Sequence, residues 1–162
     1  MKYTTIQDRR GVAFRVRMDI DTIMWRIDIL DGHIPIGKIL AMPLDNILRL
    51  QDICLFSEVW HSEYPPVRFF RWLLGIPRSS KNYRFRGLGP ELIKLLVQLA
   101  QIHDFERIEG EIKENDFQRD TWLPDWYRAQ GFIVKATTST TKPFTLLMHI
   151  KGTPVDNSAA SP

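Results

Sequence analysis

Apolar and polar residues alternate along the first third of the chain, with the period of two that indicates strands with one buried face. Between Val12 and Ile20 every second residue is apolar, and the residues between them are small or charged. Asp31-Gly32 is a strong hairpin signal between two such stretches. The pattern predicts four near-consecutive, antiparallel strands before the first helix, in residues 11–20, 24–30, 33–42 and 46–56.

The period changes at Pro90, where a helix is predicted to begin. Apolar side chains cover most of this helix, and one narrow polar stripe consists of Glu91, Lys94, Gln98 and Gln101. We therefore expect the helix to be largely buried. Pro90 suits its first position, because the missing N–H would have no intrahelical acceptor there.

The second half of the chain mixes strands and helices. The predicted elements are a strand at ERIEGEIK (106–113), a helix at LPDWYRAQ (123–130) that Gly131 ends, and closing strands at 132–137 and 144–151. Strands and helices in this order predict an α/β protein with a mixed, mostly antiparallel sheet that is flanked by helices.

Composition supports a single domain. A chain of 162 residues that is 44% hydrophobic can bury a core without disulfides or metal. We expect one domain over residues 1–151, with a long insert at 60–83, and a disordered tail over 152–162. Cys54 is the only cysteine, and no stretch approaches the ~18 apolar residues of a membrane span. The sequence therefore predicts a cytoplasmic protein without a membrane segment.

The net charge is only +3, but basic residues gather before the predicted helix. Between Tyr64 and Pro90 there is no Asp or Glu, while the basic residues are Arg68, Arg71, Arg78, Lys81, Arg84 and Arg86. Such a local positive field suits an anionic partner, for example a phosphate-rich cofactor, a nucleic acid or a lipid headgroup. A solvated basic loop is the alternative interpretation.

The turn RFRGLG, Arg84 to Gly89, directly precedes the helix. A glycine turn at a helix N-terminus can attract a phosphate through unpaired N–H groups and the positive end of the helix dipole. A dinucleotide-binding turn would need a third glycine where Leu92 stands, and no Walker A loop is present. Two specific phosphate-binding motifs are thereby excluded.

Two stretches carry a resemblance to a known family. R-x-x-G-x-G before an apolar helix resembles motif A of the GNAT superfamily, the acetyl-CoA-dependent N-acyltransferases, whose signature is Q/R-x-x-G-x-G/A. DWYRAQGF (125–132) resembles the family's lYeklGF segment on a later helix and turn. The order of elements over about residues 45–150 is also that of the family. The resemblance implies a GNAT-like fold and direct transfer of an acetyl group from acetyl-CoA to a primary amine.

The resemblance also implies where coenzyme A binds. Backbone amides of the turn would wrap its pyrophosphate, and the residues concerned are Arg84, Phe85, Arg86, Gly87, Leu88 and Gly89. Gly87 and Gly89 lack the Cβ that would collide with phosphate oxygens. The end of the preceding strand, at Leu55 and Phe56, would pair with the pantetheine arm as an added strand would. Pro90 departs from the family, because it offers no N–H to the cofactor.

Acetyl transfer needs a base for the amine, a donor for the oxyanion and an acid for the leaving thiolate. By the resemblance, the N–H of Leu55 would polarise the thioester carbonyl and Tyr127 would protonate the sulfur. An aromatic ring packed on the sheet is the alternative interpretation of Tyr127. Glu58 is the predicted base, with Glu109 and Glu111 as alternatives, and a surface glutamate at a strand end is the alternative interpretation of Glu58.

One face of the strand at 106–113 is polar, and Glu109 and Glu111 lie on it. A polar face on a central strand is unusual unless a cleft or a partner lies over it. Relatives carry two helices between their first and second strands, and this chain has no room for them. We hypothesise that the insert at 60–83, or a second subunit in a homodimer, covers the exposed face of the sheet.

Other functions have weaker support in the residues. VRFFRW and YRFR alternate aromatics with arginines as nucleic-acid grooves do, but an amphipathic helix above a cofactor site explains them without nucleic acid. The histidines lack metal-ligand spacing, so no metal is predicted, and they are His33, His61, His103 and His149. The expected acceptor is a small-molecule or peptide amine. The alternative function is a GNAT-fold acyl-CoA-binding module with weak or no catalysis.

Overall fold

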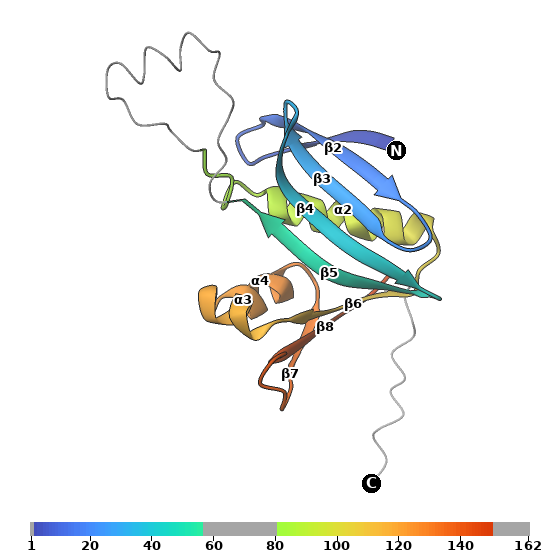
Figure 1. Cartoon of the computed structure of the whole chain (residues 1–162), viewed down its shortest axis with the longest axis vertical. Helices are drawn as coiled ribbons and strands as arrows, with labels where there is room; N and C mark the ends of the chain where they lie inside the picture. Colours follow the sequence, from blue (N-terminus) through green and yellow to red (C-terminus); the bar gives the residue numbers. More distant parts are fainter. Residues whose placement is uncertain (1, 57–80, 151–162) are drawn as a thin grey trace, which may run out of the picture. The chain divides into compact units, whose positions relative to one another are not determined.

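A computed structural model of the chain describes residues 2–56 and 81–150 (Figure 1). Its elements are β1 (Lys2–Gln7), β2 (Ala13–Ile20), β3 (Trp25–Asp31), β4 (Ile34–Leu44), β5 (Ile47–Leu55), α2 (Leu88–Ile102), β6 (Arg107–Ile112), α3 (Glu114–Arg119), α4 (Leu123–Ala129), β7 (Ile133–Ala136) and β8 (Phe144–His149). The strands form an eight-stranded sheet in the order β1-β2-β3-β4-β5-β6-β8-β7. β5 and β6 pair in parallel, whereas β1 with β2, β2 with β3, and β8 with β6 and β7 pair antiparallel.

The predicted fold class, a mixed and mostly antiparallel α/β sheet, is therefore confirmed. Residues 2–56 contain strands and turns but no helix, as the sequence predicts for the start of the chain. The predicted insert lies outside the described residues except for 81–83, and so do Glu58 and the predicted tail. Among the residues that are described, no helix is long and apolar enough to cross a bilayer.

The chain divides into two compact units, and each is described by itself. Unit 1 contains residues 1–21, 25–40 and 52–92, and unit 2 contains residues 22–24, 41–51 and 93–162. That residues 1–151 act as one domain stays a prediction.

The strand β2 of unit 1 follows the predicted alternation. In β2 the apolar residues Phe14, Val16 and Met18 are buried, and the positions between them are exposed or half-buried. The sequence did not indicate β1, because Ile6 is the only residue of this strand that is buried. The core of unit 1 also contains Trp25, Ile27, Ile29, Ile36, Ile39, Tyr83, Leu88 and Leu92.

Helix α2 begins at Leu88, two residues before the predicted start. Pro90 is thus its third residue, and it still fits because the N–H groups of the first turn have no intrahelical acceptor. Lys94, Gln98 and Gln101 are exposed, and Glu91 is half-buried, which confirms the polar stripe.

Unit 2 contains the strands and short helices of the second half. Its core comprises Ala41, Leu48, Leu50, Ile93, Leu96, Ala100, Phe105, Ile108, Ile112, Tyr127, Phe132, Leu146 and Met148. The strand β6 and the helix α4 were predicted, and Gly131 follows α4 with a left-handed φ of 93°. The helix α3 was not predicted, because none of its residues is buried and its sequence carries no apolar periodicity.

Candidate functional site

The turn before α2 has a left-handed backbone at two residues. Phe85 has a φ of 62° and Gly87 a φ of 85°, a region that side chains other than glycine rarely adopt. A Cβ on Gly87 would lie 2.6 Å from Cγ of Arg9. The N–H of Arg9 also donates to the carbonyl of Arg86 at 2.9 Å. In this structure the missing Cβ of Gly87 makes room for the stem of Arg9, a different reason from the predicted approach of a phosphate.

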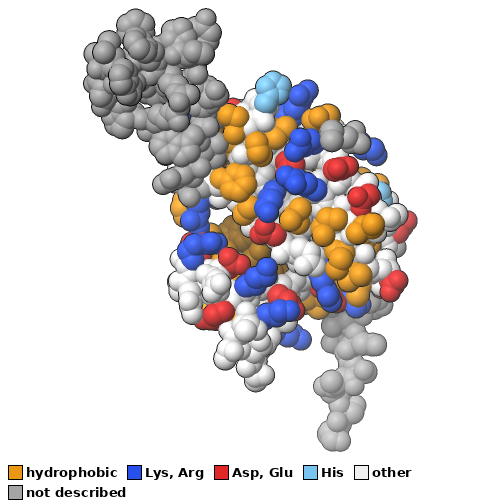
Figure 2. All heavy atoms as spheres, viewed as in Figure 1, with side chains coloured by type: hydrophobic (Ala, Val, Ile, Leu, Met, Phe, Trp, Pro, Cys, Tyr) orange, Lys and Arg blue, Asp and Glu red, His pale blue; other side chains and the backbone are white. Residues whose placement is uncertain are grey.

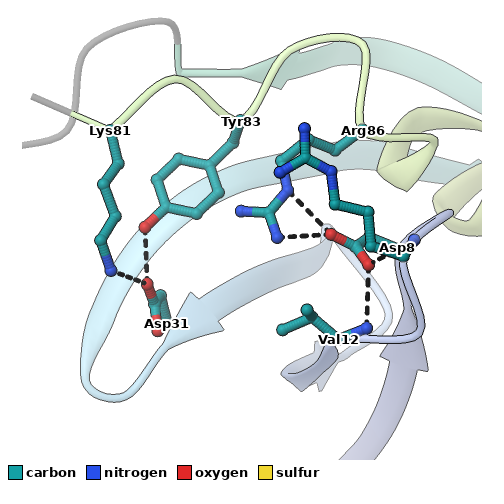
Figure 3. A network of polar contacts seen from close by, with 7 residues as sticks. Asp8, Val12, Asp31, Lys81, Tyr83 and Arg86 are labelled. Atoms are coloured by element: carbon teal, nitrogen blue, oxygen red, sulfur yellow. Dashed lines mark hydrogen bonds and ion pairs between the residues drawn. The ribbon is translucent and has the colours of Figure 1, made fainter.

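A buried ion pair holds the turn to the β1–β2 connection (Figure 3). Nε of Arg86 donates to Oδ2 of Asp8 at 2.8 Å, and Nη2 donates to the same oxygen. The other carboxylate oxygen accepts the backbone N–H groups of Arg10 and Val12, each at 2.9 Å. The side chain of Asp8 is completely buried and that of Arg86 is 19% exposed. The conformation of residue 86 is therefore fixed by a partner 78 positions earlier in the chain.

These hydrogen bonds keep Asp8 charged. Burial alone would raise the pKa of the Asp8 carboxyl, but hydrogen bonds from the N–H of Val12 and from Arg86 outweigh it. The pKa of Asp8 consequently lies below its usual value. The guanidinium of Arg86 also lies over the rings of Phe14 and Tyr83, at 5.0 and 5.4 Å from their centres, which adds cation–π attraction.

A second carboxylate holds the start of the turn. The hydroxyl of Tyr83 donates to Oδ2 of Asp31 at 2.6 Å, and Nζ of Lys81 lies 3.4 Å from the same oxygen (Figure 3). Tyr83 is fully buried, and this burial together with the bond to Asp31 raises its pKa above the usual value. Asp8 and Asp31 thus anchor the segment 81–86 at both ends.

The anchoring changes the expected electrostatics of the basic segment. Two of its cations, Lys81 and Arg86, are paired with carboxylates of unit 1. Figure 2 shows basic and acidic side chains intermixed on the face that it draws. Arg68, Arg71 and Arg78, which also belong to the basic segment, lie outside the described residues.

The end of β5 places Leu55 and Phe56 in unit 1. The N–H of Phe56 donates to the carbonyl of Ile36 at 2.9 Å, so it points toward β4. Because N–H directions alternate along a strand, the N–H of Leu55 points to the opposite edge of β5. A Cβ on Gly37 would lie 2.5 Å from Cδ2 of Leu55, so this glycine lets the Leu55 side chain pack across β4.

The pairing between β5 and β6 is short. It joins Ile47 to Arg107 and ends where Leu50 pairs with Gly110, while β5 continues to Leu55 and β6 to Ile112. Past the last pair, the edge of β5 that bears the N–H of Leu55 is not used by this ladder.

Unit 2 contains a polar cleft with a volume of about 320 Å³. It is lined by Arg49, Leu50, Gln51, Glu109, Gly110, Glu111, Lys113, Ile133, Lys135, Thr145, Leu146 and Leu147. The expectation of a cleft over the polar face of β6 agrees with this position. Glu109 and Glu111, the alternative bases, both lie in it, and each is ion-paired, to Arg107 at 2.7 Å and to Lys142 at 2.6 Å.

Tyr127 lies in α4 of unit 2 and is only 7% exposed. Its ring makes edge contacts with Trp126 and Phe132, at 4.9 and 5.4 Å between ring centres. This environment agrees with the interpretation of Tyr127 as a packing residue, and its role as an acid stays a prediction.

The predicted residues fall into two groups. Leu55, Phe56 and the turn from Arg84 to Gly89 belong to unit 1, whereas Tyr127, Glu109 and Glu111 belong to unit 2. Within the described ranges, no group of His, Cys, Asp or Glu residues could hold a metal ion.

Three residues that hold the turn, Asp8, Arg9 and Asp31, are not among the predicted site residues. A weak signal for Asp8 is the stretch D-R-R-G between two strands, since an Asp before a glycine turn commonly binds backbone N–H groups. No pattern in the sequence predicts the contact of Asp8 with Arg86 or that of Asp31 with Tyr83.

No protein-family model and no curated protein matches the sequence. Solved structures do match its fold. The GNAT domain of S. lividans PAT has a TM-score of 0.64 at 8% identity, over 91% of this chain and 96% of that one. A GNAT-family acetyltransferase from Staphylococcus aureus has a TM-score of 0.55 at 13% identity, over 80% of this chain and 70% of that one.

The PaiA N-acetyltransferase from Thermoplasma acidophilum, solved in complex with coenzyme A, has a TM-score of 0.54 at 13% identity. The match covers 78% of this chain but 61% of the Thermoplasma protein, so the chain spans less than two thirds of that protein's length. The similarity thus lies in the arrangement of elements far more than in sequence. The chain has the fold of the GNAT N-acetyltransferases.

Proposed function

We propose that the protein is an N-acetyltransferase that moves an acetyl group from acetyl-CoA directly to a primary amine. The observation that carries the proposal is the GNAT fold combined with a glycine turn, held in a left-handed conformation, directly before α2. A solved structure of the same fold holds coenzyme A. The proposed setting is the cytoplasm, in keeping with a lone cysteine that forms no disulfide.

The turn would hold the pyrophosphate of the cofactor. Backbone N–H groups from Arg84 to Gly89 and the positive end of the α2 dipole suit a phosphate. Pro90 contributes no N–H, so the binding relies on the residues before it. The side chain of Arg86 is engaged with Asp8, so its proposed contribution is the backbone amide.

The β5 edge would hold the pantetheine arm, as an added strand pairs with a sheet edge. Support comes from the N–H of Leu55, which points away from β4, and from the end of the β5–β6 ladder at Leu50. When bound, acetyl-CoA supplies an activated acetyl thioester. Leu55 would donate its N–H to the carbonyl oxygen of that acetyl group and so stabilise developing negative charge.

The amine must lose a proton, and the sulfur must gain one, as the new C–N bond forms and the C–S bond breaks. Glu58 is the proposed base, with Glu109 and Glu111 as alternatives, and Tyr127 is the proposed acid. Glu109 and Glu111 both line the polar cleft of unit 2.

A second candidate function is an acyl-CoA-binding module without transfer. The burial of Tyr127 between two aromatic rings favours it, because a buried phenol is poorly placed to reach a thiolate. Binding without transfer to any amine would select this candidate.

The first test is calorimetric titration of acetyl-CoA into the wild-type protein, Gly89→Trp and Gln98→Trp. Gly89 lies in the first turn of α2, where an indole would block the turn, whereas Gln98 lies on the exposed face of the same helix. We expect binding to wild type and Gln98→Trp, and none to Gly89→Trp. Absence of binding to a folded wild-type protein would refute the proposal.

Transfer is tested next with an amine panel and the variant Tyr127→Phe. If Tyr127 is the acid, kcat falls in this variant while the affinity for acetyl-CoA is kept. An unchanged kcat would assign Tyr127 to packing alone.

A further inference from the structure

We propose that the polar cleft of unit 2 selects an acceptor that carries a carboxylate beside its amine, such as a free amino acid. The inference rests on the proposed function and adds the class of acceptor to it. It derives from the charges that line the cleft and from the partners that those charges have.

The two glutamates of the cleft are already paired with positively charged residues. Glu109 accepts a hydrogen bond from Arg107, and Glu111 is paired with Lys142. Neither Arg107 nor Lys142 belongs to the lining of the cleft. Both carboxylates are therefore ion-paired with residues outside the cleft lining, so they do not require a cationic ligand.

The positively charged residues of the cleft lack such ion pairs. Arg49, Lys113 and Lys135 line it, and none of the three has an ion-pair partner among the residues that the structure describes. They come from β5, from the residue after β6 and from β7. Three cations that line one cleft and have no ion-pair partner in the described part of the chain favour an anionic ligand.

The volume of the cleft and the other polar groups in its lining narrow the class of ligand. A volume of about 320 Å³ lies at the low end of small-molecule sites, so a single small metabolite fits better than a long chain. The guanidinium of Arg49 can bind a planar carboxylate through two parallel hydrogen bonds. Gln51 and Thr145 add uncharged hydrogen-bonding groups that suit an amine or hydroxyl.

The cleft also includes the end of the β5–β6 ladder. Leu50 and Gly110, the last pair of the β5–β6 ladder, are part of its lining. The proposed path of the pantetheine arm follows the β5 edge beyond that pair. A carboxylate held at the cations would therefore lie in a cleft whose lining includes this last pair. Polyamines and lysine-rich peptides would be disfavoured by repulsion from the same cations.

The test compares acceptors that differ only in the carboxylate. Acetyl transfer from acetyl-CoA is followed by thiol release with a panel of free amino acids, the matching amino acid amides, and spermidine. We expect kcat/KM for the best free acid to exceed that of its amide by roughly tenfold or more. Equal or faster transfer to the amides or spermidine overturns the inference, and so does transfer to no acid by a protein that binds acetyl-CoA.

Variants locate the selectivity. Arg49→Gln and Lys135→Gln should raise KM for the acid acceptor roughly tenfold while KM for acetyl-CoA stays unchanged. Arg15→Gln is the matched control, because Arg15 is a strand arginine of unit 1 that lies over the ring of Tyr3. Retention of the acid preference in both cleft variants would overturn the assignment of the cleft.

A binding experiment separates this inference from the proposed function. N-acetylglycine and N-acetylglycinamide are titrated into the isotope-labelled protein without cofactor, and amide resonances are followed by NMR. Shifts at Arg49, Gly110 and Lys135 with the acid but not the amide support an anion-selective cleft even if acetyl-CoA does not bind. Equal shifts with both probes, or none, overturn it.

Discussion

The turn before α2 and the polar cleft of unit 2 both gather charged residues, but they use them in opposite ways. At the turn, the Asp8 side chain is fully buried and Arg86 is 19% exposed, and each satisfies the other. In the cleft, the side chains of Glu109 and Glu111 are 30% and 46% exposed. Its three positively charged residues, Arg49, Lys113 and Lys135, have no ion-pair partner within the described part of the chain.

The difference separates charges that hold structure from charges that remain available to a ligand. A buried, hydrogen-bonded pair fixes the backbone around it and is costly to break on one side. Exposed charges contribute little to stability and can respond to a bound molecule. Basic residues of the turn should therefore be judged by what they pair with, and not by their number.

Removal of the Asp8 carboxylate should have the largest effect on the stability of the protein. Asp8→Ala leaves the Arg86 guanidinium and two backbone N–H groups without their acceptor, so we expect the largest loss of stability among these variants. The displaced turn should weaken acetyl-CoA binding roughly 10- to 100-fold. Urea unfolding and calorimetry measure the two effects.

The matched control for Asp8→Ala is Asp52→Ala, which removes the partner of Lys38 in a half-exposed pair. This control should change the free energy of unfolding by about 0–1 kcal/mol. Equal losses in the two variants would contradict the role given to Asp8.

Gly87 and Gly11 offer a second comparison, within unit 1. Both have a left-handed φ, of 85° and 77°, so alanine at either should cost about 1–2 kcal/mol. Only at Gly87 would the new Cβ also meet Arg9, whereas nothing lies within 4 Å at Gly11. We expect Gly87→Ala to lose more stability, and Arg9→Ala to remove the excess. Equal losses in both glycine variants would show that the Arg9 contact is unimportant.

Tyr83→Phe tests the other anchor through pH. At neutral pH the lost hydrogen bond to Asp31 should cost about 1 kcal/mol. The raised pKa of Tyr83 means that the folded state keeps the proton more tightly than the unfolded state, whose pKa is near 10.0. The advantage of wild type is therefore complete below that pH and declines as pH rises toward the folded pKa. Denaturant unfolding at several pH values measures it, and a constant difference would be contrary to the expectation.

The smallest effect is expected in the cleft. Lys135→Ala removes an exposed cation without a described partner, so the free energy of unfolding should change by no more than about 0.5 kcal/mol. Thermal unfolding and acetyl-CoA titration should match wild type. A clear loss of stability would mean that the cleft charges hold structure after all.

Local patterns in the sequence predicted most of the fold. The strand β2 was predicted well because one of its faces is packed on apolar neighbours, which imposes alternation along the strand. β1 buries only Ile6 and α3 buries nothing, so neither left a pattern. The helix α2 begins two residues before the predicted start, because Pro90 fits the third position of a helix as well as the first.

The candidate site was only partly predictable. Gly87 and Gly89 pointed to the turn, and the polar face of β6 pointed to the cleft. The anchors could not be found, because Asp31 and Tyr83 are 52 positions apart and Asp8 and Arg86 are 78 apart. Such contacts depend on the three-dimensional path of the chain, and no local periodicity encodes them.

The short ladder between β5 and β6 has a consequence for how the protein folds. Each β5 residue in it pairs with one 60 positions later, whereas partners in the β2–β3 hairpin are 5 to 15 positions apart. Closing the longer loop costs more chain entropy and slows contact formation. In pulse-labelled refolding, we expect the amides of β6 to gain protection after those of β3. The strand end that lines the cleft would then be among the last parts of the sheet to form.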